Sequence, residues 1–514
     1  MGKRLVDQRI RFGIRKLSVG VCSVVVATCF LGATTSYAEE QAENSEPREE
    51  QVETSDVDHQ GKEEKTVNEH QEESEHASAA TSEKENGAVS QGTEASQPAT
   101  SLNEEPEIAD YGPLPSKDQM QYHREELAAF IHFGMNTYYD REWGDGQEDP
   151  YYFYPEHLDT DQWIKTLKDA GFKRTIMVVK HHDGFLLYPS KYTDHTIAKS
   201  GWKDGKGDVL AEVSASASKY DMDMGVYLSP WDAHSPLYHV DTEDQYNEYY
   251  LNQLKEILED PKYGNKGKFV EVWMDGARGD GAQKVTYTFD KWFEAIRKAQ
   301  GDIAIFSAEP TNVRWIGNEK GVAGDPVWQK VNPDKIRNNP SNSYLNHGDP
   351  EGKQYSVGEA DVSIRSGWFY HDNQEPKSLR ELMDIYFKSV GRGTPLLLNI
   401  PPNQDGKFAD ADVARLKEFR QTLDQLYSVN YAAGALVEAD STRRNPLYKA
   451  SHLTDGDEKT SWAPSDDAKT GSFVLDLGKE QHFDVVELKE TIEKGQRISG
   501  FNIDVAVNGQ WVPF

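Results

Sequence analysis

The sequence predicts an α/β protein, with a (β/α)8-like barrel over residues 107–430 followed by a β-sandwich over residues 431–514. Apolar runs alternate with amphipathic stretches through the first region, which indicates a parallel sheet covered by helices. Several runs end in polar or aromatic residues, as barrel strands do on the face that carries a site. An open doubly wound sheet is the alternative, but no G-x-G-x-x-G motif follows any of these runs.

Residues 1–38 have the form of a secretory signal peptide. A basic stretch precedes an apolar run from Leu17 to about Ala33, and Ser36-Tyr37-Ala38 offers a small-x-small cleavage site. A retained membrane anchor is the alternative. The stretch "FGIRKLSVGVCS" (12–23) resembles the YSIRK-type signal of Gram-positive surface proteins. We therefore expect a secreted or cell-surface protein of a Gram-positive-like bacterium, with no membrane insertion once the signal is removed.

Both cysteines, Cys22 and Cys29, fall inside this predicted signal. The mature chain would then contain no cysteine, which excludes disulfides, thiolate zinc sites and a cysteine nucleophile.

Residues 39–106 are predicted to form a disordered acidic linker. Residues 39–103 contain 18 Asp and Glu against 4 Lys and Arg, and no Phe, Trp or Tyr. Such a segment cannot bury enough apolar surface to offset its ordering entropy. The formal net charge of the whole chain is −31, which argues against nucleic acid as a partner.

The barrel elements can be placed by pattern. The stretches 160–171 and 246–260 have helical periodicity. Candidate strands are "LAAFIHFGM" (127–135), "TIMVVKHHDGF" (175–185), "MGVYLSPW" (224–231), "KFVEVWMDGA" (268–277), "IAIFSAEP" (303–310) and "PLLLNIPP" (395–402). Their ends include His132, His181, His182, Tyr227, Asp275 and Glu309. In a barrel these ends meet on one face.

Asp275 ends a buried-looking strand, and Trp273 lies two residues earlier on the same side of it. Asp-Gly is also an ordinary turn signal, and Trp273 could be a core aromatic. An aromatic wall beside a carboxylate suits a sugar ring. Glycosidic bonds are usually cleaved by two carboxylates.

The second carboxylate is left open by the pattern. The candidates are Glu271, Asp280, Glu309 and Glu319, the last of these in the loop-like "VRWIGNEKG" (313–321). The physics of the sequence does not choose between Glu309 and Glu319.

His181 and His182 are adjacent, so in an extended strand they would point to opposite faces. We therefore expect only one of them to face the site, as a hydrogen-bonding group and not as a metal ligand. His132 could equally be a core histidine.

Together these motifs resemble the α-L-fucosidases of glycoside hydrolase family twenty-nine. The resemblance covers residues 115 to 430 and rests on "FIHFGMNTYYDREW", "VVKHHDGFLLYPS", "GVYLSPWD", "EVWMDGARGDG", "RWIGNEKG" and "LLLNIPPNQDG". Family members have a (β/α)8-like barrel followed by a β-sandwich. The motifs "DGARGDG" and "GNE" resemble the branch that removes α-1,3/4-linked fucose from Lewis-type glycans, so fucosylated oligosaccharides or glycoproteins are the expected partners.

The resemblance also implies roles for residues. Asp275 corresponds to the nucleophile and Glu319 to the general acid/base of a retaining double displacement that needs no cofactor. The positions that correspond to the fucose pocket are His132, Glu142, Trp143, His181, His182, Tyr227 and Trp273. The alternatives are a barrel glycosidase of another specificity, such as a galactosidase, and a catalytically inactive fucose-binding lectin or adhesin.

The C-terminal region also resembles a known module. "HLTDGDEKTSWAP" (452–464) is similar to discoidin-like carbohydrate-binding domains, and about 80 residues is short for such a sandwich, so we expect a truncated domain. Asp455 and Asp457 could hold a structural calcium or simply form a turn. No metal is expected in the catalytic site.

Overall fold

The computed structural model describes residues 11–18, 22–27, 104–238, 243–278 and 285–514. Residues 39–103 of the predicted linker, and the candidate Asp280, lie outside these ranges. Among the described residues, no helix has the length and apolar character that crossing a bilayer requires.

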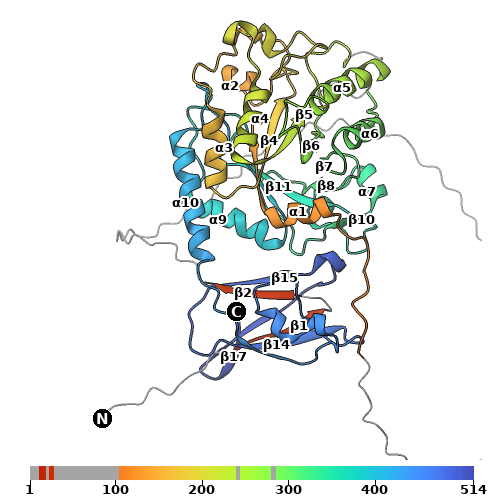
Figure 1. Ribbon diagram of the computed structural model, residues 1–514, viewed down its shortest axis with the longest axis vertical. Helices are drawn as coiled ribbons and strands as arrows, with labels where there is room; N and C mark the ends of the chain where they lie inside the picture. Colours follow the sequence, from red (N-terminus) through yellow and green to blue (C-terminus); the bar gives the residue numbers. More distant parts are fainter. Residues whose placement is uncertain (1–10, 19–21, 28–103, 239–242, 279–284) are drawn as a thin grey trace, which may run out of the picture. The chain divides into compact units, whose positions relative to one another are not determined.

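Eight parallel strands close into a barrel, which confirms the predicted fold class (Figure 1). β12 pairs with both β11 and β3, and this pairing closes the ring. The strands are β3 (Leu127–Ile131), β4 (Arg174–Lys180), β5 (Asp223–Leu228), β6 (Glu271–Trp273), β7 (Ala304–Phe306), β8 (Val313–Trp315), β11 (Val357–Ser363) and β12 (Leu396–Asn399).

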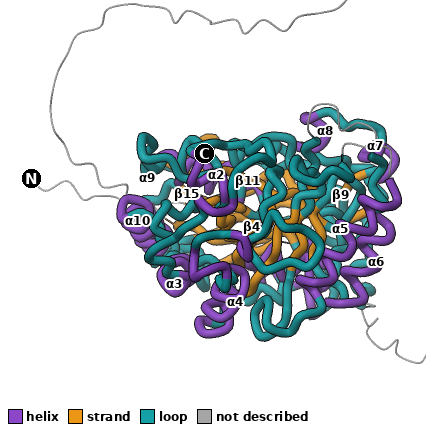
Figure 2. Tube along the Cα trace, turned by 90° about the horizontal axis from the view of Figure 1, so that it is seen from above, coloured by secondary structure: helices purple, strands orange, loops and turns teal. Residues whose placement is uncertain are grey.

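Helices surround the strands, as Figure 2 shows from above. The outer helices are α3 (Thr160–Asp169), α4 (Val209–Tyr220), α5 (Glu243–Leu258), α6 (Phe289–Gln300), α9 (Leu379–Lys388) and α10 (Asp410–Leu426). Residues 307–312 join β7 and β8 without a helix, so the barrel is (β/α)8-like rather than regular. Shorter elements are α1 (Lys117–Glu125), α2 (Met135–Tyr139), β9 (Lys330–Val331), α7 (Pro333–Arg337), α8 (Asn342–His347) and β10 (Gln354–Tyr355).

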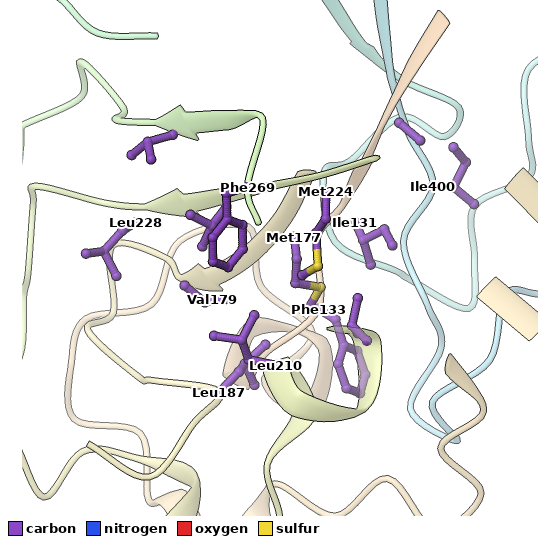
Figure 3. Packing of buried hydrophobic residues seen from close by; sticks show 14 of the residues in the cluster. Ile131, Phe133, Met177, Val179, Leu187, Leu210, Met224, Leu228, Phe269 and Ile400 are labelled. Atoms are coloured by element: carbon purple, nitrogen blue, oxygen red, sulfur yellow. The ribbon is translucent and has the colours of Figure 1, made fainter. Parts of the chain in front are cut away.

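Strand side chains alternate between two buried layers. One set fills the barrel interior and includes Phe130, Val178, Trp273 and Phe306. The other set packs outward with the helices; Figure 3 shows part of it, with Ile131, Met177 and Met224 from three neighbouring strands close together. Burying a side chain of this size stabilises the fold by about 1.5–3 kcal/mol. Because both faces are buried, these strands have near-continuous apolar sequences.

The C-terminal region forms a smaller strand-rich domain. Its strands are β13 (Leu436–Ala439), β14 (Thr470–Asp476), β15 (Val485–Glu490), β16 (Ile503–Val507) and β17 (Gln510–Pro513). Trp462, Phe473 and Leu475 are buried in its core. In the full-length chain two strands of the N-terminal segment join it: β1 (Arg11–Ser18) lies between β14 and β16, and β2 (Cys22–Ala27) pairs with β15.

The last residues of the predicted linker, 104–106, are described and contact the C-terminal domain. The Glu105 carboxylate accepts hydrogen bonds from the backbone N–H groups of Arg444 at 2.6 Å and Asp466 at 3.0 Å. Arg443 donates to the carbonyl of Pro106 at 2.7 Å. The chain is therefore anchored from Glu105 onward, slightly before the predicted boundary.

Candidate active site

Asp275 lies just after β6, at the carboxyl end of the barrel, and each of its two carboxylate oxygens accepts a hydrogen bond that orients the group. The Tyr227 hydroxyl donates to Oδ2 at 2.9 Å, and the backbone N–H of Ala277 donates to Oδ1 at 2.7 Å. Burial raises the pKa of Tyr227 well above its usual range, and the Asp275 charge raises it further, so the phenol remains a donor. About a quarter of the Asp275 side chain stays exposed, at 24%. A fixed, accessible carboxylate therefore marks this end of the barrel.

Three histidines gather around this carboxylate, and their hydrogen-bond partners define the tautomer of each ring. Asn399 Oδ1 accepts from both the backbone N–H and Nδ1 of His132, at 3.2 and 2.8 Å, so His132 Nε2 carries no proton in the neutral ring. Asn136 donates its amide to His181 Nδ1 at 3.3 Å, so His181 Nε2 carries the proton. Burial lowers the pKa of His132 to about 4 and that of His181 well below its usual value. Both rings are therefore neutral near pH 7.

His182 also faces the site, so the expectation that only one of the adjacent histidines would do so is wrong. β4 ends at Lys180, and because the chain then turns, strand alternation does not apply. The rings of His181 and His182 lie 4.1 Å apart. Ser229 donates to the Trp231 carbonyl at 2.7 Å and thus accepts from His182 Nδ1 at 2.8 Å. His182 Nε2 then lies 3.8 Å from Asp275 Oδ2 as a second acceptor.

Glu142 and Trp143 come from the segment after α2. Glu142 accepts from the backbone N–H of Trp368 at 2.7 Å and from His371 Nε2 at 2.6 Å. Burial opposes the charged form of His371, but its bonds to Asp140 and Glu142 outweigh this effect and raise its pKa. Trp143 is 63% exposed, and its ring contacts His182 edge-on at 6.0 Å. These contacts place Glu142 and Trp143 at the rim of the same site.

Trp273 and Glu271 lie below this layer, inside the barrel. Trp273 stacks on Phe306 at 3.8 Å and donates to Glu359 at 2.7 Å, so its ring forms the floor under Tyr227 and Asp275. Glu271 is fully buried and accepts from Arg174 at 2.9 Å. Glu271 is thus committed to a structural ion pair.

The two open candidates for the second carboxylate have different surroundings. Glu309 pairs with Arg337 of α7 at 3.2 Å. Glu319 lies in the loop after β8, and Trp368 donates its indole N–H to Glu319 Oε2 at 3.2 Å. Trp368 also packs on His132, with ring centroids 5.1 Å apart. The Trp368 indole therefore links Glu319 to the histidine cluster.

Sequence reasoning missed several residues of this site. Asn399, Ser229 and Asn136 fix the histidine rings, as described above, and Asn399 ends β12, so the strand-end rule could have found it. Asp361 of β11 was also missed; it is 4% exposed and accepts from the Trp315 indole at 3.0 Å. No sequence signal pointed to Trp368.

Asp455 and Asp457 of the C-terminal domain were the candidates for a structural calcium site or a turn. Asp455 accepts from Asp457 N at 3.0 Å and from the Thr460 hydroxyl at 2.7 Å, and Asp457 accepts from Lys459 N at 2.9 Å. These are turn hydrogen bonds. In the described ranges no three His, Cys, Asp or Glu side chains gather as a metal site.

Most of the chain matches known protein families. The alpha-L-fucosidase family profile matches residues 115–425, the YSIRK type signal peptide profile matches residues 7–32, and the F5/8 type C domain profile matches residues 437–514. The last of these is the discoidin-like module that the tail resembles.

Individual relatives agree with the alpha-L-fucosidase match. The chain is 40% identical over 404 residues to alpha-L-fucosidase 1 of Arabidopsis thaliana, which covers 78% of either protein. Its fold matches the crystal structure of SpGH29 with a TM-score of 0.78 and 59% identity, over 79% of this chain and 90% of that one. A Ruminococcus gnavus GH29 fucosidase solved in complex with fucose matches with a TM-score of 0.75 and 42% identity, over 80% and 89% of the two chains.

Proposed function

The chain belongs to the α-L-fucosidase family of glycoside hydrolases, and from this premise we propose that it is a retaining exo-enzyme acting on terminal α-1,3/1,4-linked fucose of Lewis-type glycans. The observation that carries the proposal is the Asp275 carboxylate, oriented by Tyr227 and Ala277 beneath a cluster of neutral histidines. The linkage preference rests on the motifs "DGARGDG" and "GNE".

The pocket suits a sugar because it offers hydroxyl partners of both kinds. His181 Nε2 can donate, whereas His132 Nε2 and His182 Nε2 can accept. His182 Nε2 and Asp275 Oδ2 are both acceptors and lie 3.8 Å apart. A substrate hydroxyl that lies beside Asp275 Oδ2 can therefore donate its proton to His182 Nε2. Glu142 and the exposed Trp143 ring at the rim would contact further hydroxyls and the C–H face of fucose.

In the first chemical step, Asp275 attacks the anomeric carbon. The bond from this carbon to the leaving oxygen breaks, and Glu319 gives its proton to that oxygen. A covalent fucosyl-enzyme forms. In the second step, ionised Glu319 takes a proton from water, the water oxygen attacks the anomeric carbon, and Asp275 is released. Two inversions retain the configuration, and we expect the two carboxyl groups to lie about 5–5.5 Å apart.

Glu319 is favoured over Glu309 as the acid/base. Trp368 connects Glu319 to the pocket, whereas Glu309 is paired with Arg337. Since the YSIRK-type signal peptide indicates secretion in Gram-positive bacteria, we place the enzyme outside the cell, secreted or on the surface, where its substrates are fucosylated oligosaccharides or glycoproteins.

The test is Asp275→Asn. This substitution keeps an acceptor for Ala277 N, so the melting temperature should change little, while hydrolysis of a chromogenic fucoside should fall below about one hundredth of wild type because losing the nucleophile costs orders of magnitude. Higher residual activity would remove Asp275 from this role. Wild-type turnover of a chromogenic galactoside instead of the fucoside, or fucose binding without turnover, would overturn the proposed activity. A panel of Lewis and H-type glycans then tests the linkage.

A further inference from the structure

The loop that carries Glu319 is held at several points. Asn318 closes it on itself: its amide donates to the Val322 carbonyl at 2.9 Å, and its Oδ1 accepts from Lys320 N at 3.1 Å. Asn346 of α8 donates to the carbonyls of Ile316 and Val322, at 3.0 and 2.9 Å, and so fixes both ends of the loop. The loop is therefore a rigid turn.

β11 contacts the inner side of this loop at both of its ends. The carbonyl of Asp361 accepts from Gly321 N at 3.2 Å, and the Asp361 carboxyl accepts from the indole of Trp315, the last residue of β8 before the loop. Gly321 has a φ of +66°, and a Cβ there would come within 2.9 Å of the Val362 side chain, so only glycine allows this close approach. Asp361 thus contacts both sides of the turn that presents Glu319.

Asp361 belongs to an inward-facing polar row along β11. Glu359 is lowest and accepts from Trp273, Asp361 is next, and Ser363 is highest and accepts from Asn399. Asp361 is thus at the level where the barrel interior opens into the site. Burial raises the pKa of Asp361 well above its usual range, and the negative charges of Glu319 and then Asp275 raise it further.

We propose that Asp361 is a positioning residue for the acid/base, whose carboxyl holds the Trp315 indole at the start of the loop so that Glu319 stays aligned with the leaving oxygen. The inference rests on the proposed function. A neutral carboxyl suits this task because it accepts from the indole through one oxygen without adding a second negative charge to the site. An ionised Asp361 would repel the Asp275 carboxylate in the first step and the ionised Glu319 in the second.

The first test compares Asp361→Ala with Asp361→Asn on two substrates. A natural glycan leaves as a poor alkoxide and needs protonation, while an activated aryl fucoside leaves as a stabilised phenolate and needs it less. Asp361→Ala should lower kcat/KM on a Lewis trisaccharide by about 100-fold, the cost typical of a misplaced catalytic group, and on the aryl fucoside by less than about 5-fold. Asp361→Asn keeps a neutral acceptor and should stay within about 3-fold on both. Equal losses on both substrates in Asp361→Ala would overturn the inference.

The pH profile tests whether the Asp361 carboxyl is neutral in the wild type. Asn replaces a neutral group with a neutral group, so the alkaline limb of kcat/KM should keep its midpoint in Asp361→Asn. A shift of more than about one pH unit would show that Asp361 is ionised in the wild type and would overturn the inference. If Asp361→Ala folds poorly, Trp315→Phe removes only the indole donor and should show the same preference for the aryl substrate.

A matched control separates positioning from general loosening. Glu125 is also a largely buried carboxylate and pairs with Arg174 at 2.5 Å, at the opposite end of the barrel from Asp275. Glu125→Ala should lower the melting temperature but affect both substrates equally; the same substrate dependence there would overturn the inference. Inactive wild-type enzyme would contradict the proposed function itself, whereas active wild type with substrate-independent losses in Asp361→Ala contradicts only the role of Asp361.

Discussion

The histidines that line the pocket are buried and neutral. Because burial lowers their pKa values, we expect the free energy of unfolding to decrease at acid pH. The pKa of His132 is about 4 in the folded protein against an ordinary value of about 6.5. As the pH falls from about 6.5 toward 4, the unfolded chain binds a proton that the folded chain does not, so the free energy of unfolding decreases. The effect of one such group is about 2–3 kcal/mol near pH 4.

His132→Gln should therefore flatten the acid side of the stability curve. Wild type should lose melting temperature steadily between pH 6.5 and 4.5, while the variant, although less stable at pH 7, should lose less over the same interval. Denaturant unfolding of both proteins at several pH values measures this difference. Parallel curves would mean that His132 titrates normally in the folded state.

Glu319 can be tested by the dependence of its loss on the leaving group. Glu319→Ala should lose far more activity on a Lewis trisaccharide than on an aryl fucoside, because only the glycan depends strongly on protonation. Azide should partly restore turnover of the aryl substrate and yield fucosyl azide of retained configuration, since a small anion attacks the fucosyl-enzyme without a general base. Glu309→Gln is the matched control and should stay within about twofold on both substrates. Equal losses and no azide product in Glu319→Ala would point to Glu309.

At the scale of single elements, the buried cation Arg174 connects two strands of the lower barrel. Arg174 of β4 donates to Glu125 at 2.5 Å and to Glu271 of β6 at 2.9 Å, and its guanidinium lies 3.9 Å from the centre of the Tyr122 ring. Burial raises the pKa of Glu271, and the Arg174 charge and hydrogen bond oppose this rise. Burial raises the pKa of the neighbouring Glu359 well above its usual range, and the Glu271 charge raises it further. Arg174 therefore stabilises the ionised form of Glu271 in a buried pair of acids.

Arg174→Met should destabilise the barrel by about 3–5 kcal/mol, because it leaves buried carboxylates without their cation. Chemical denaturation at pH 7 measures the loss. Lys165→Met, which breaks the exposed Lys165–Asp169 pair on α3, is the control and should leave the melting temperature unchanged. A loss from Arg174→Met no larger than that of the control would mean that the buried pair contributes nothing to stability.

Element patterns also explain what the sequence could and could not predict. Six barrel strands were found because most of their outward and inward positions are apolar. β11 was missed because Glu359, Asp361 and Ser363 face the interior and interrupt the apolar run. β8 was missed because Arg314 interrupts its three residues, whereas the equally short β6 and β7 lie in the longer apolar stretches "FVEVWM" and "IAIF". The inward polar residues that interrupt the apolar pattern of β11 include Asp361, the residue proposed above to position Glu319. Strand ends located Asp275 and His132, while Trp368 was missed because it lies in the segment after β11, whose strand was not predicted.

For the molecule as a whole, the boundary between the acidic linker and the folded chain can be tested by two deletions. Removing residues 39–103 should leave both kcat/KM and the melting temperature unchanged, since that segment lacks the apolar residues needed to pack on the enzyme. Removing residues 39–110 should lower the melting temperature. This longer deletion takes away the Glu105 carboxylate from Arg444 and Asp466, and Ile108, which packs against Tyr448 and donates to its hydroxyl at 3.2 Å.

Both deletions are compared with the chain that begins at residue 39, by thermal melting and by turnover of the chromogenic fucoside. Because the anchoring contacts join residues 105–108 to the C-terminal domain and not to Asp275 or Glu319, the longer deletion should lower stability while kcat at a temperature well below melting stays the same. Equal melting temperatures for the two deletions would show that the anchor contributes no stability. A fall in kcat after the shorter deletion would show that the acidic segment takes part in catalysis.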